Sequence, residues 1–251
     1  MEGRSLPWRD AGDGVRVALF GTAKLTCYPP GLQQPRHGHD EPHVSVLVAG
    51  SFREDGRVGP QTPAPAAVSY RPAGFAHELS FGPSGAVVLT LPGRNLDPAG
   101  RRSGWLETGA GAQVARLVRT AVRQLDAALG EELLWDVLAA GVAPPAAQPP
   151  TWLREARDRL LEEPLTSVQA LAASVGRHRV HVSRMFRAAF GVSPSELKQR
   201  AMASRALQAV ANGRPPVQAA WDAGYSDQSH MTRALVRFVG LPPARLGQRF
   251  R

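Results

Sequence analysis

Four histidines in the first third of the sequence have spacings that suit metal or ligand binding. His37 and His39 are separated by one residue, and His43 and His77 follow further along the chain. Neutral imidazoles bind zinc, iron, copper and nickel. If this stretch is a strand, alternation places His37 and His39 on one face, as shared ligation requires. The four residues are therefore candidates for a metal or effector site.

A second group of candidate binding residues lies on two basic helical stretches near the C-terminus. Arginine and glutamine can make bidentate contacts with purine edges in the major groove of DNA. A short helix placed in that groove presents such side chains to the bases. The candidate DNA-binding residues are Arg179, His181 and Arg184 on the first stretch, and Gln228, His230 and Arg233 on the second.

Each basic stretch is the second helix of a helix-turn-helix pattern, and the first pattern runs from Leu165 to Gly191. Thr166 or Ser167 can cap its opening helix. Gly176 ends that helix because glycine tolerates a left-handed backbone. Apolar residues recur at helical spacing on both helices. They are Val168, Leu171, Ala172 and Val175 on the opening helix, and Val182, Met185, Phe186 and either Ala189 or Phe190 on the basic helix.

The second helix-turn-helix pattern runs from Pro215 to Gly240. Ser226 is expected to cap its basic helix, and Asp227 suits the positive helix start. One uninterrupted helix is expected over 197–211, and it would fix the distance between the two units. Apolar spacing predicts the residues that form the two helices of this unit. They are Val217, Ala220, Trp221 and Gly224 on the opening helix, and Met231, Leu235 and Phe238 on the basic helix.

The N-terminal part carries short apolar runs broken by turns, and no helical pattern interrupts them. Many short strands of this kind predict a small antiparallel sandwich or barrel. Turns are expected at 29–31, 54–56 and 72–74. Strands are expected at 15–19, 23–28, 44–49, 67–70, 77–81 and 86–91.

The middle of the chain connects these two parts. Segment 92–109 is expected to be a connector, and two amphipathic helices follow within 110–142. These helices either form a dimer or pack on their own barrel. A helix over 152–163 then packs on the first helix-turn-helix unit, with Trp152 as a core residue. The expected fold class is α+β, with a sensor domain at 1–143, a Pro-rich linker at 144–150 and an all-α DNA-binding domain at 151–251.

The last hundred or so residues resemble the DNA-binding domain of the AraC/XylS family of transcriptional regulators. The matching residues are Phe186 with Gly191-Val-Ser-Pro194, Arg205-Ala-Leu207, Gly224-Tyr-Ser-Asp-Gln-Ser-His230, and Phe238 with Gly240-Leu-Pro242. The resemblance implies two basic helices in successive major grooves, about one helical turn apart. It also implies RNA polymerase as a partner and activation of transcription. His178 departs from the family, which usually has a serine cap before the first basic helix.

The histidines resemble the two motifs of the cupin barrel. The first motif is His37-Gly-His39 followed by His43 and Gly50, and the second is Pro72-Ala-Gly74-Phe-Ala-His77. His43 stands where the family usually has a glutamate. The resemblance implies a jelly-roll barrel in which the four side chains converge on one divalent transition metal. The alternative is an apolar pocket for an organic effector, in which the histidines are motif remnants that supply hydrogen bonds.

Charge is distributed unevenly along the 251 residues. Residues 151–251 carry a net charge of +9, whereas residues 1–150 carry equal numbers of acidic and basic side chains. A basic domain beside a neutral one indicates a polyanionic partner. Because Cys27 is the single cysteine, no intrachain disulfide can form. With no signal-like N-terminus and no long apolar run, we expect a cytoplasmic protein without membrane association.

Together these features predict a sequence-specific transcriptional regulator that binds double-stranded DNA and is not an enzyme. A small molecule or metal in the barrel would change how the DNA-reading helices are presented, through homodimer geometry or through linker contacts. The alternative is a cupin metalloenzyme, such as a dioxygenase, fused to a DNA-binding tail. The four histidines suit that alternative, but the sequence shows no further acid–base or nucleophile constellation.

Overall fold

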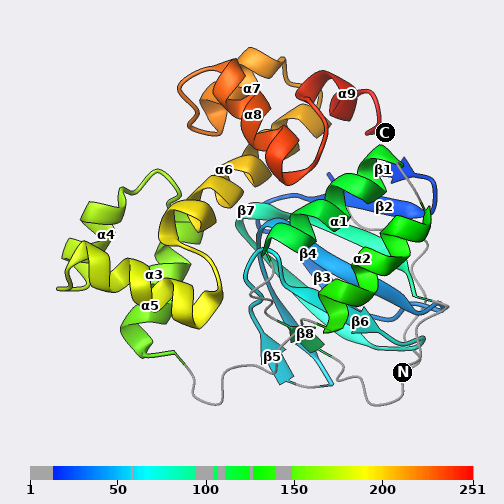
Figure 1. Cartoon of the computed structure of the whole chain (residues 1–251), viewed down its shortest axis with the longest axis horizontal. Helices are drawn as coiled ribbons and strands as arrows, with labels where there is room; N and C mark the ends of the chain where they lie inside the picture. The colour runs from blue at the N-terminus through cyan, green and yellow to red at the C-terminus, as the bar shows by residue number, and fades with distance from the viewer. Residues whose placement is uncertain are drawn as a thin grey trace.

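The computed structural model describes residues 14–57, 59–93, 104–106, 111–124, 127–139 and 149–250. Figure 1 shows an antiparallel sheet in the N-terminal part and helices in the C-terminal part, so the predicted α+β class is confirmed. The strands are β1 (Arg16–Phe20), β2 (Ala23–Tyr28), β3 (Gln33–His37), β4 (His43–Gly56), β5 (Gly59–Gln61), β6 (Val68–Arg71), β7 (His77–Pro92) and β8 (Gly104–Leu106). The helices are α1 (Gly111–Arg123), α2 (Ala127–Ala139), α3 (Thr151–Glu162), α4 (Val168–Ser174), α5 (Arg179–Phe190), α6 (Pro194–Ala211), α7 (Pro216–Asp222), α8 (Gln228–Phe238) and α9 (Pro243–Gly247).

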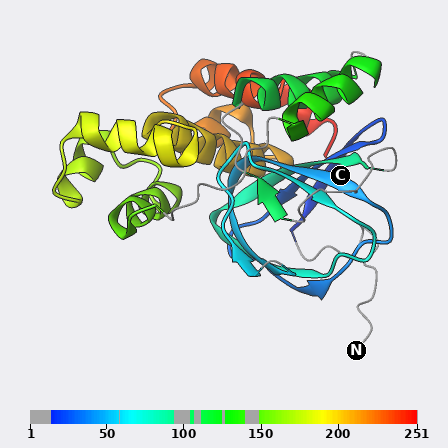
Figure 2. The same ribbon diagram turned by 60° about the horizontal axis from the view of Figure 1, so that its bottom comes forward.

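Two long strands, β4 and β7, organise the sheet. They pair antiparallel along most of their length. The path of neighbouring strands is β1-β2-β7-β4-β6-β8, with β3 added to β7 and β5 added to β4. Figure 2 shows that the sheet curls around an interior, as a barrel does. Alternate residues of each strand therefore point into that interior.

The β4–β7 ladder contains two register shifts. One falls at Val48, and the other lies between Gly50 and Phe52. Gly50 has a φ of +82°, and a Cβ at this position would lie 2.1 Å from the carbonyl oxygen of Gly85. The two backbones approach so closely here that only glycine fits. At the shift, the carbonyl oxygen of Val48 accepts a hydrogen bond from Arg200 of α6.

The strand predictions hold for most of the sheet, with four differences. The strands predicted at 77–81 and 86–91 are one continuous strand, β7, which bends at the second register shift. The turn predicted at 54–56 lies inside β4, because the hairpin to β5 closes only after Gly56. The polar sequence of β3 gave no strand signal. Within the expected connector, β8 pairs with β6 and extends the sheet.

Helices α1 and α2 pack on the sheet with their apolar faces. Val118 of α1 and Leu134 of α2 belong to the same buried cluster as Val46 of β4 and Leu89 of β7. Figure 1 shows both helices lying across the sheet. Of the two arrangements expected for these helices, the chain shows packing on their own barrel.

The first helix-turn-helix unit, α4 and α5, has a separate core that it shares with α3 and the start of α6. Ser167 caps α4 by accepting a hydrogen bond from the backbone N–H of Ala170. His178 caps α5, because its Nδ1 accepts from the backbone N–H of Val180 at 3.3 Å. An imidazole thus takes the place of the usual serine, and the helix begins at Arg179.

The second unit, α7 and α8, begins its basic helix differently from the prediction. Ser226 is not the cap of α8. Asp227 is, because its carboxylate accepts a hydrogen bond of 2.7 Å from the backbone N–H of His230. A carboxylate also suits the positive end of the helix dipole better than a hydroxyl does.

The apolar spacing on α7 does not mark the buried face of that helix. Trp221 is 70% exposed and Val217 is 54% exposed, whereas Ala219 and Ala220 are fully buried. Small side chains allow α7 to pack closely against the neighbouring helices, and this leaves the larger ones outside. Of the residues predicted for this helix, Ala220 is buried, Val217 and Trp221 are exposed, and Gly224 follows the end of α7.

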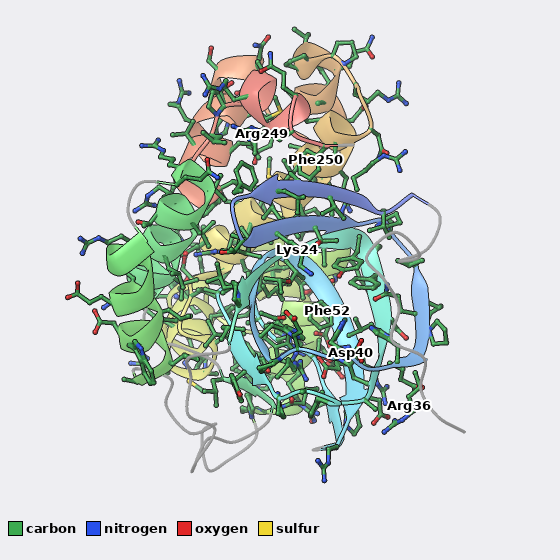
Figure 3. All side chains as sticks on the ribbon, turned by 90° about the vertical axis from the view of Figure 1, so that its right-hand side faces the viewer. Lys24, Arg36, Asp40, Phe52, Arg249 and Phe250 are labelled. Atoms are coloured by element: carbon green, nitrogen blue, oxygen red, sulfur yellow. The ribbon has the colours of Figure 1, made fainter. Side chains whose placement is uncertain are left out.

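Helix α6 joins the two units and lies directly against the sheet. Met202 and Leu207 belong to the same buried cluster as the sheet and α8, so the second unit and the sheet share one core. At the C-terminal end, Phe250 forms an isolated bridge with Ala18 of β1, and Figure 3 shows this return of the chain. No helix in the described ranges is long and apolar enough to cross a membrane.

Candidate functional site

Three of the four predicted histidines converge inside the curled sheet. His37, His39 and His77 each offer a ring nitrogen, and these nitrogens lie within 4.8 Å of one another. The Nε2 atoms of His37 and His77 are 3.2 Å apart. Two nitrogens bound to one zinc ion at its usual bond length are about 3.0–3.4 Å apart, so this spacing fits a shared ion.

His43 lies beside this cluster but is not part of it. Its ring centroid is 4.8 Å from that of His39, and its Nδ1 lies 3.2 Å from the carbonyl oxygen of Glu41. The sequence prediction that four histidines converge on one point is therefore met by three of them. The reason is that His43 opens β4, whereas His37 ends β3 and His77 begins β7, which pair directly.

The hydrogen bonds behind two of the rings fix which nitrogens face the cluster. Nδ1 of His37 lies 2.9 Å from the carbonyl oxygen of Pro35, which can only accept, so this nitrogen carries the proton. Nδ1 of His77 lies 3.3 Å from the carboxylate of Glu54, and it has no other partner among the residues that the structure describes. The two Nε2 atoms then face each other across the cluster, an arrangement that a shared cation would satisfy.

Glu54 is itself held by a buried network. Arg71 donates two hydrogen bonds to its carboxylate, and the indole N–H of Trp105 donates a third at 2.6 Å. The Arg71 guanidinium also lies over the rings of Phe75 and Trp105. Burial alone would raise the pKa of Glu54, but its hydrogen bond to His77 and the Arg71 charge outweigh burial and lower this pKa to about 2. Glu54 therefore stays ionised and orients His77.

The pKa values of three imidazoles at the site, those of His37, His39 and His43, are lowered, which favours their neutral form. Burial lowers the pKa of His37. Burial and the neighbouring histidines lower the pKa of His39 to about 3. Burial lowers the pKa of His43 to about 4. The contact with the carbonyl group of Glu41 opposes this shift, and the Arg71 charge adds to it. Neutral imidazole is the form that binds a metal.

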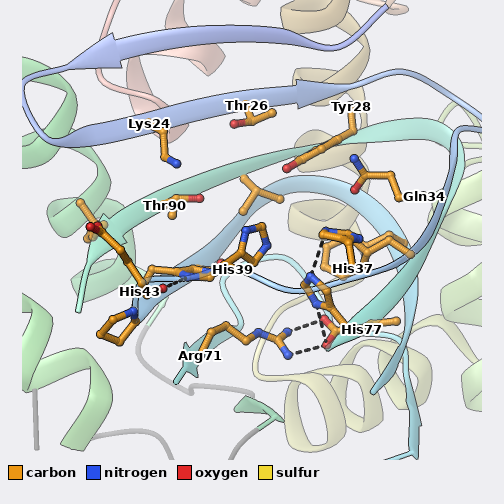
Figure 4. Close-up of a pocket in the computed structure, with 18 of the residues that line it drawn as sticks. Lys24, Thr26, Tyr28, Gln34, His37, His39, His43, Arg71, His77 and Thr90 are labelled. Carbon is orange, nitrogen blue, oxygen red and sulfur yellow. Dashed lines mark hydrogen bonds and ion pairs between the residues drawn. The ribbon is translucent and has the colours of Figure 1, made fainter. Parts of the chain in front are cut away.

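The histidines line a cavity of about 460 Å³ within the sheet. Figure 4 shows them across the cavity from side chains of β2 and β7. The cavity lining is mixed, because apolar side chains such as Phe52, Phe81 and Val88 line it beside polar ones. Its polar residues include Lys24, Thr26 and Tyr28 from β2, Ser45 from β4 and Thr90 from β7.

The predicted DNA-binding residues lie on α5 and α8, and they divide into two sets. Four are exposed, namely Arg179 and Arg184 on α5 and Gln228 and Arg233 on α8. The two histidines have contacts within the chain. The ring of His181 stacks on Trp152 of α3, with centroids 5.8 Å apart, and Nδ1 of His230 lies 3.2 Å from the hydroxyl of Ser226.

A family model for a helix-turn-helix domain matches residues 171–249. This part of the chain is an AraC-type helix-turn-helix domain. No curated protein matches the chain.

Among solved structures, ToxT from Vibrio cholerae strain SCE256 with a bound unsaturated fatty acid is 10% identical to this chain. The match covers 93% of this chain and 95% of ToxT, with a TM-score of 0.38. KdgF from Halomonas sp. is 19% identical over 36% of this chain and 89% of its own, with a TM-score of 0.29. A cupin domain from Bordetella pertussis tohama I is 22% identical over 28% of this chain and 79% of its own, with a TM-score of 0.24.

Several residues of the site were not found from the sequence. Glu54 was placed in a turn, although it follows Phe52 by two positions, the spacing of one strand face. Arg71 directly precedes the Pro72 motif and could have been suspected from that position. Lys24 and Trp105 carry no sequence signal, because only the pairing of distant strands brings them to the cavity.

Proposed function

We propose that the protein is a sequence-specific transcriptional regulator, and an activator, whose DNA-binding domain is controlled by a metal or small molecule in the barrel cavity. The observation that carries this proposal is the match of residues 171–249 to a helix-turn-helix domain. The exposed basic and amide side chains of α5 and α8 support it. They include Arg179 and Arg184 on the first of these helices and Arg233 on the second.

In this proposal α5 and α8 enter successive major grooves of double-stranded DNA, and α6 sets the distance between them. Arginine and glutamine read base edges, so Arg184, Gln228 and Arg233 would contribute sequence preference. His181 and His230 would act partly through their contacts within the chain, because they hold the start of each basic helix. RNA polymerase is the expected partner of an activator, and a homodimer would pair two such readers on one operator.

Control passes from the cavity to α6 through backbone contacts. Gln208 of α6 donates hydrogen bonds to the carbonyl oxygens of Tyr28, at 2.6 Å, and Ala86, at 3.2 Å. The side chain of Tyr28 lines the cavity and stacks on Phe81, with centroids 4.4 Å apart. A ligand that moves Tyr28 therefore changes a contact of the helix that spaces the two DNA-reading units.

Two further contacts hold the DNA-binding helices on the sheet and α1. Arg200 of α6 donates to the carbonyl oxygen of Val48, which the bulge in β4 leaves available, at 3.2 Å. Arg123 of α1 donates to the carbonyl oxygen of Gly240, just beyond α8, at 2.8 Å. A change in the barrel thus reaches α8 by two routes.

In the metal form of the proposal, His37, His39 and His77 would hold a divalent transition ion. The spacing of their ring nitrogens supports this assignment. A bound ion supplies a positive centre with open positions for a ligand's oxygen or nitrogen atoms. Glu54 would keep the His77 ring oriented from the far side, as carboxylates behind metal-binding histidines do.

The proposal is tested by gel retardation of the DNA upstream of its own gene with full-length protein, first stripped of metal and then loaded with Zn²⁺. We expect DNA binding in at least one state and a change in affinity between the two. If neither the metal-free nor the Zn²⁺-loaded protein binds the DNA, a DNA-binding function is contradicted. Equal binding in both states would contradict metal control and leave a small molecule as the controlling ligand.

The histidine cluster also favours a second function, a cupin metalloenzyme with a DNA-binding tail. Three histidines around an open cavity are the kind of site that catalytic metals occupy. Oxygen uptake by the Fe²⁺-loaded protein with candidate substrates separates the two functions. Turnover that persists when Arg233 is replaced by alanine would support the enzyme, and metal binding without turnover would support the sensor.

A further inference from the structure

The cavity wall opposite the histidines contains a row of polar side chains that no metal site requires. Lys24 of β2 pairs with Thr90 of β7, and Thr90 pairs with Ser45 of β4. Residues directly opposite one another in an antiparallel sheet point to the same face. All three line the cavity, so one ammonium and two hydroxyls form a continuous row across three strands. Figure 4 shows Lys24 and Thr90 of this row. Barrel interiors are ordinarily apolar, and this row therefore indicates a hydrophilic ligand.

Lys24 is unusual both for its residue type and for its position. The chain has 30 Lys and Arg residues, of which only Lys24 and Lys198 are lysine. Lys24 is half-buried and makes no salt bridge in the described part of the chain, whereas Arg71, the other cation lining the cavity, is paired with Glu54. A compact ammonium on a flexible stem suits one oxygen group of a ligand better than a planar guanidinium does.

Lys24 lines the same cavity as the histidines. The acids Asp40 and Glu41 also line the cavity, but both are exposed at its mouth, where water screens them. Because Arg71 and Glu54 pair with each other, the unpaired charge inside the cavity is the positive charge of Lys24.

We propose that the cavity binds a small hydrophilic carboxylate. One carboxylate group pairs with the ammonium of Lys24, the hydroxyls of Thr90 and Ser45 donate to further oxygens, and the remaining oxygens face the histidines, where a bound ion would attract them. A volume of about 460 Å³ suits a small molecule. A long acyl chain is disfavoured, because it would leave the polar row without partners. This proposal rests on the proposed function in one respect, namely that the carboxylate is the ligand that regulates DNA binding.

The two lysines allow a test with an internal control. Full-length, Zn²⁺-loaded protein is treated with an amine-acetylating reagent, with and without oxalate or 2-oxoglutarate, and the acetylation of each lysine is followed by mass spectrometry. Lys198 lies on α6, where its ammonium donates to the carbonyl oxygen of Leu165. We expect saturating carboxylate to slow acetylation of Lys24 about tenfold or more and to leave Lys198 unchanged. Equal rates at Lys24 with and without both carboxylates would overturn the proposal.

Binding affinity gives a second, independent readout by isothermal titration calorimetry. Replacing Lys24→Met removes one charged hydrogen-bonding group, which should weaken binding of the carboxylate about 10- to 100-fold. Lys198→Met is the matched control and should bind as the unchanged chain does. If Lys24→Met does not fold, Thr90→Val provides the comparison and should weaken binding by a smaller factor.

Other ligands define the outcomes that contradict the proposal. Protection of Lys24 by palmitoleate but by neither carboxylate would show that the ligand is amphipathic. Binding of glucose with equal affinity in the unchanged chain and Lys24→Met would show that the row recognises a neutral polyol. Gel retardation of DNA by the same preparations tests the two proposals separately. If the protein binds DNA but no carboxylate, the carboxylate proposal fails and the DNA-binding function stands.

Discussion

Replacing Glu54 by glutamine removes the charge at the centre of the buried network behind His77. Glu54 is 3% exposed and Arg71 is 1% exposed. The substitution leaves the Arg71 guanidinium buried without a counter-ion, and breaking a buried pair in this way costs about 3–5 kcal/mol. The pKa of Glu54 gives a similar figure, because a shift from 4.5 to about 2 corresponds to about 3 kcal/mol. We expect Glu54→Gln to lower the free energy of unfolding by about 3 kcal/mol.

Chemical denaturation at pH 7 measures this change. The matched control is Glu163→Gln, whose carboxylate lies 3.6 Å from Arg159 but is 62% exposed, and its expected cost is below about 1 kcal/mol. The double variant Glu54→Gln/Arg71→Met should recover stability relative to Glu54→Gln, because it leaves no unpaired charge. If Glu54→Gln costs no more than the control, the network does not hold His77 as described.

The same carboxylate predicts a pH dependence with a definite sign. Because folding lowers the pKa of Glu54, its stabilisation is fully present above pH 4.5 and is lost as the pH falls toward 2. The histidines act in the same direction over a higher range. The pKa of His39 is about 3 in the fold, so the unfolded chain takes up the proton first as the pH falls below 6.5. In Glu54→Gln the stability loss below pH 4.5 should therefore be shallower than in the unchanged chain.

Three further substitutions test the site, the coupling and the DNA-binding face. His39→Ala should abolish binding of one Zn²⁺ per chain, measured by metal analysis after dialysis, whereas His43→Ala should retain the ion; the opposite order would place the site elsewhere. Gln208→Met should keep DNA binding but reduce the change in affinity that Zn²⁺ produces, and an unchanged Zn²⁺ response would rule out this contact as the route. Arg233→Ala should cost about 1–3 kcal/mol on a selected DNA site and less on random DNA, whereas the same change at Arg245, on α9, should affect both DNAs equally.

Much of the fold follows from local signals in the sequence. The cap Ser167 and the uninterrupted run of α6 were visible in the sequence, whereas the cap at His178 was not, because imidazole is an unusual cap. Hydroxyl and glycine residues at helix ends act over a few positions, so their effect is visible in one stretch of chain. The capping of α8 was misplaced by one residue because two adjacent side chains can both cap.

The site was only partly predictable, and the reason is its dependence on strand pairing. The histidine motifs identified the cluster because their spacing reflects a local strand and turn. The cluster excludes His43, because His43 pairs with Pro92 at the far end of β7, whereas His37 pairs with His77 at its start. Lys24 and Trp105 reach the cavity only through long-range pairing of β2 with β7 and of β8 with β6. Nor does spacing reveal that alanines rather than Trp221 face the core.

The central claim is that this chain reads DNA sequence through α5 and α8. The most direct measurement selects binding sites for the full-length protein from random DNA and then compares its affinity for the selected site and for random DNA over a range of salt concentrations. We expect a preference of at least about 10³-fold for the selected site, with both affinities falling linearly on a logarithmic salt scale. Equal affinity for selected and random DNA, or no enrichment of any sequence, would contradict the account.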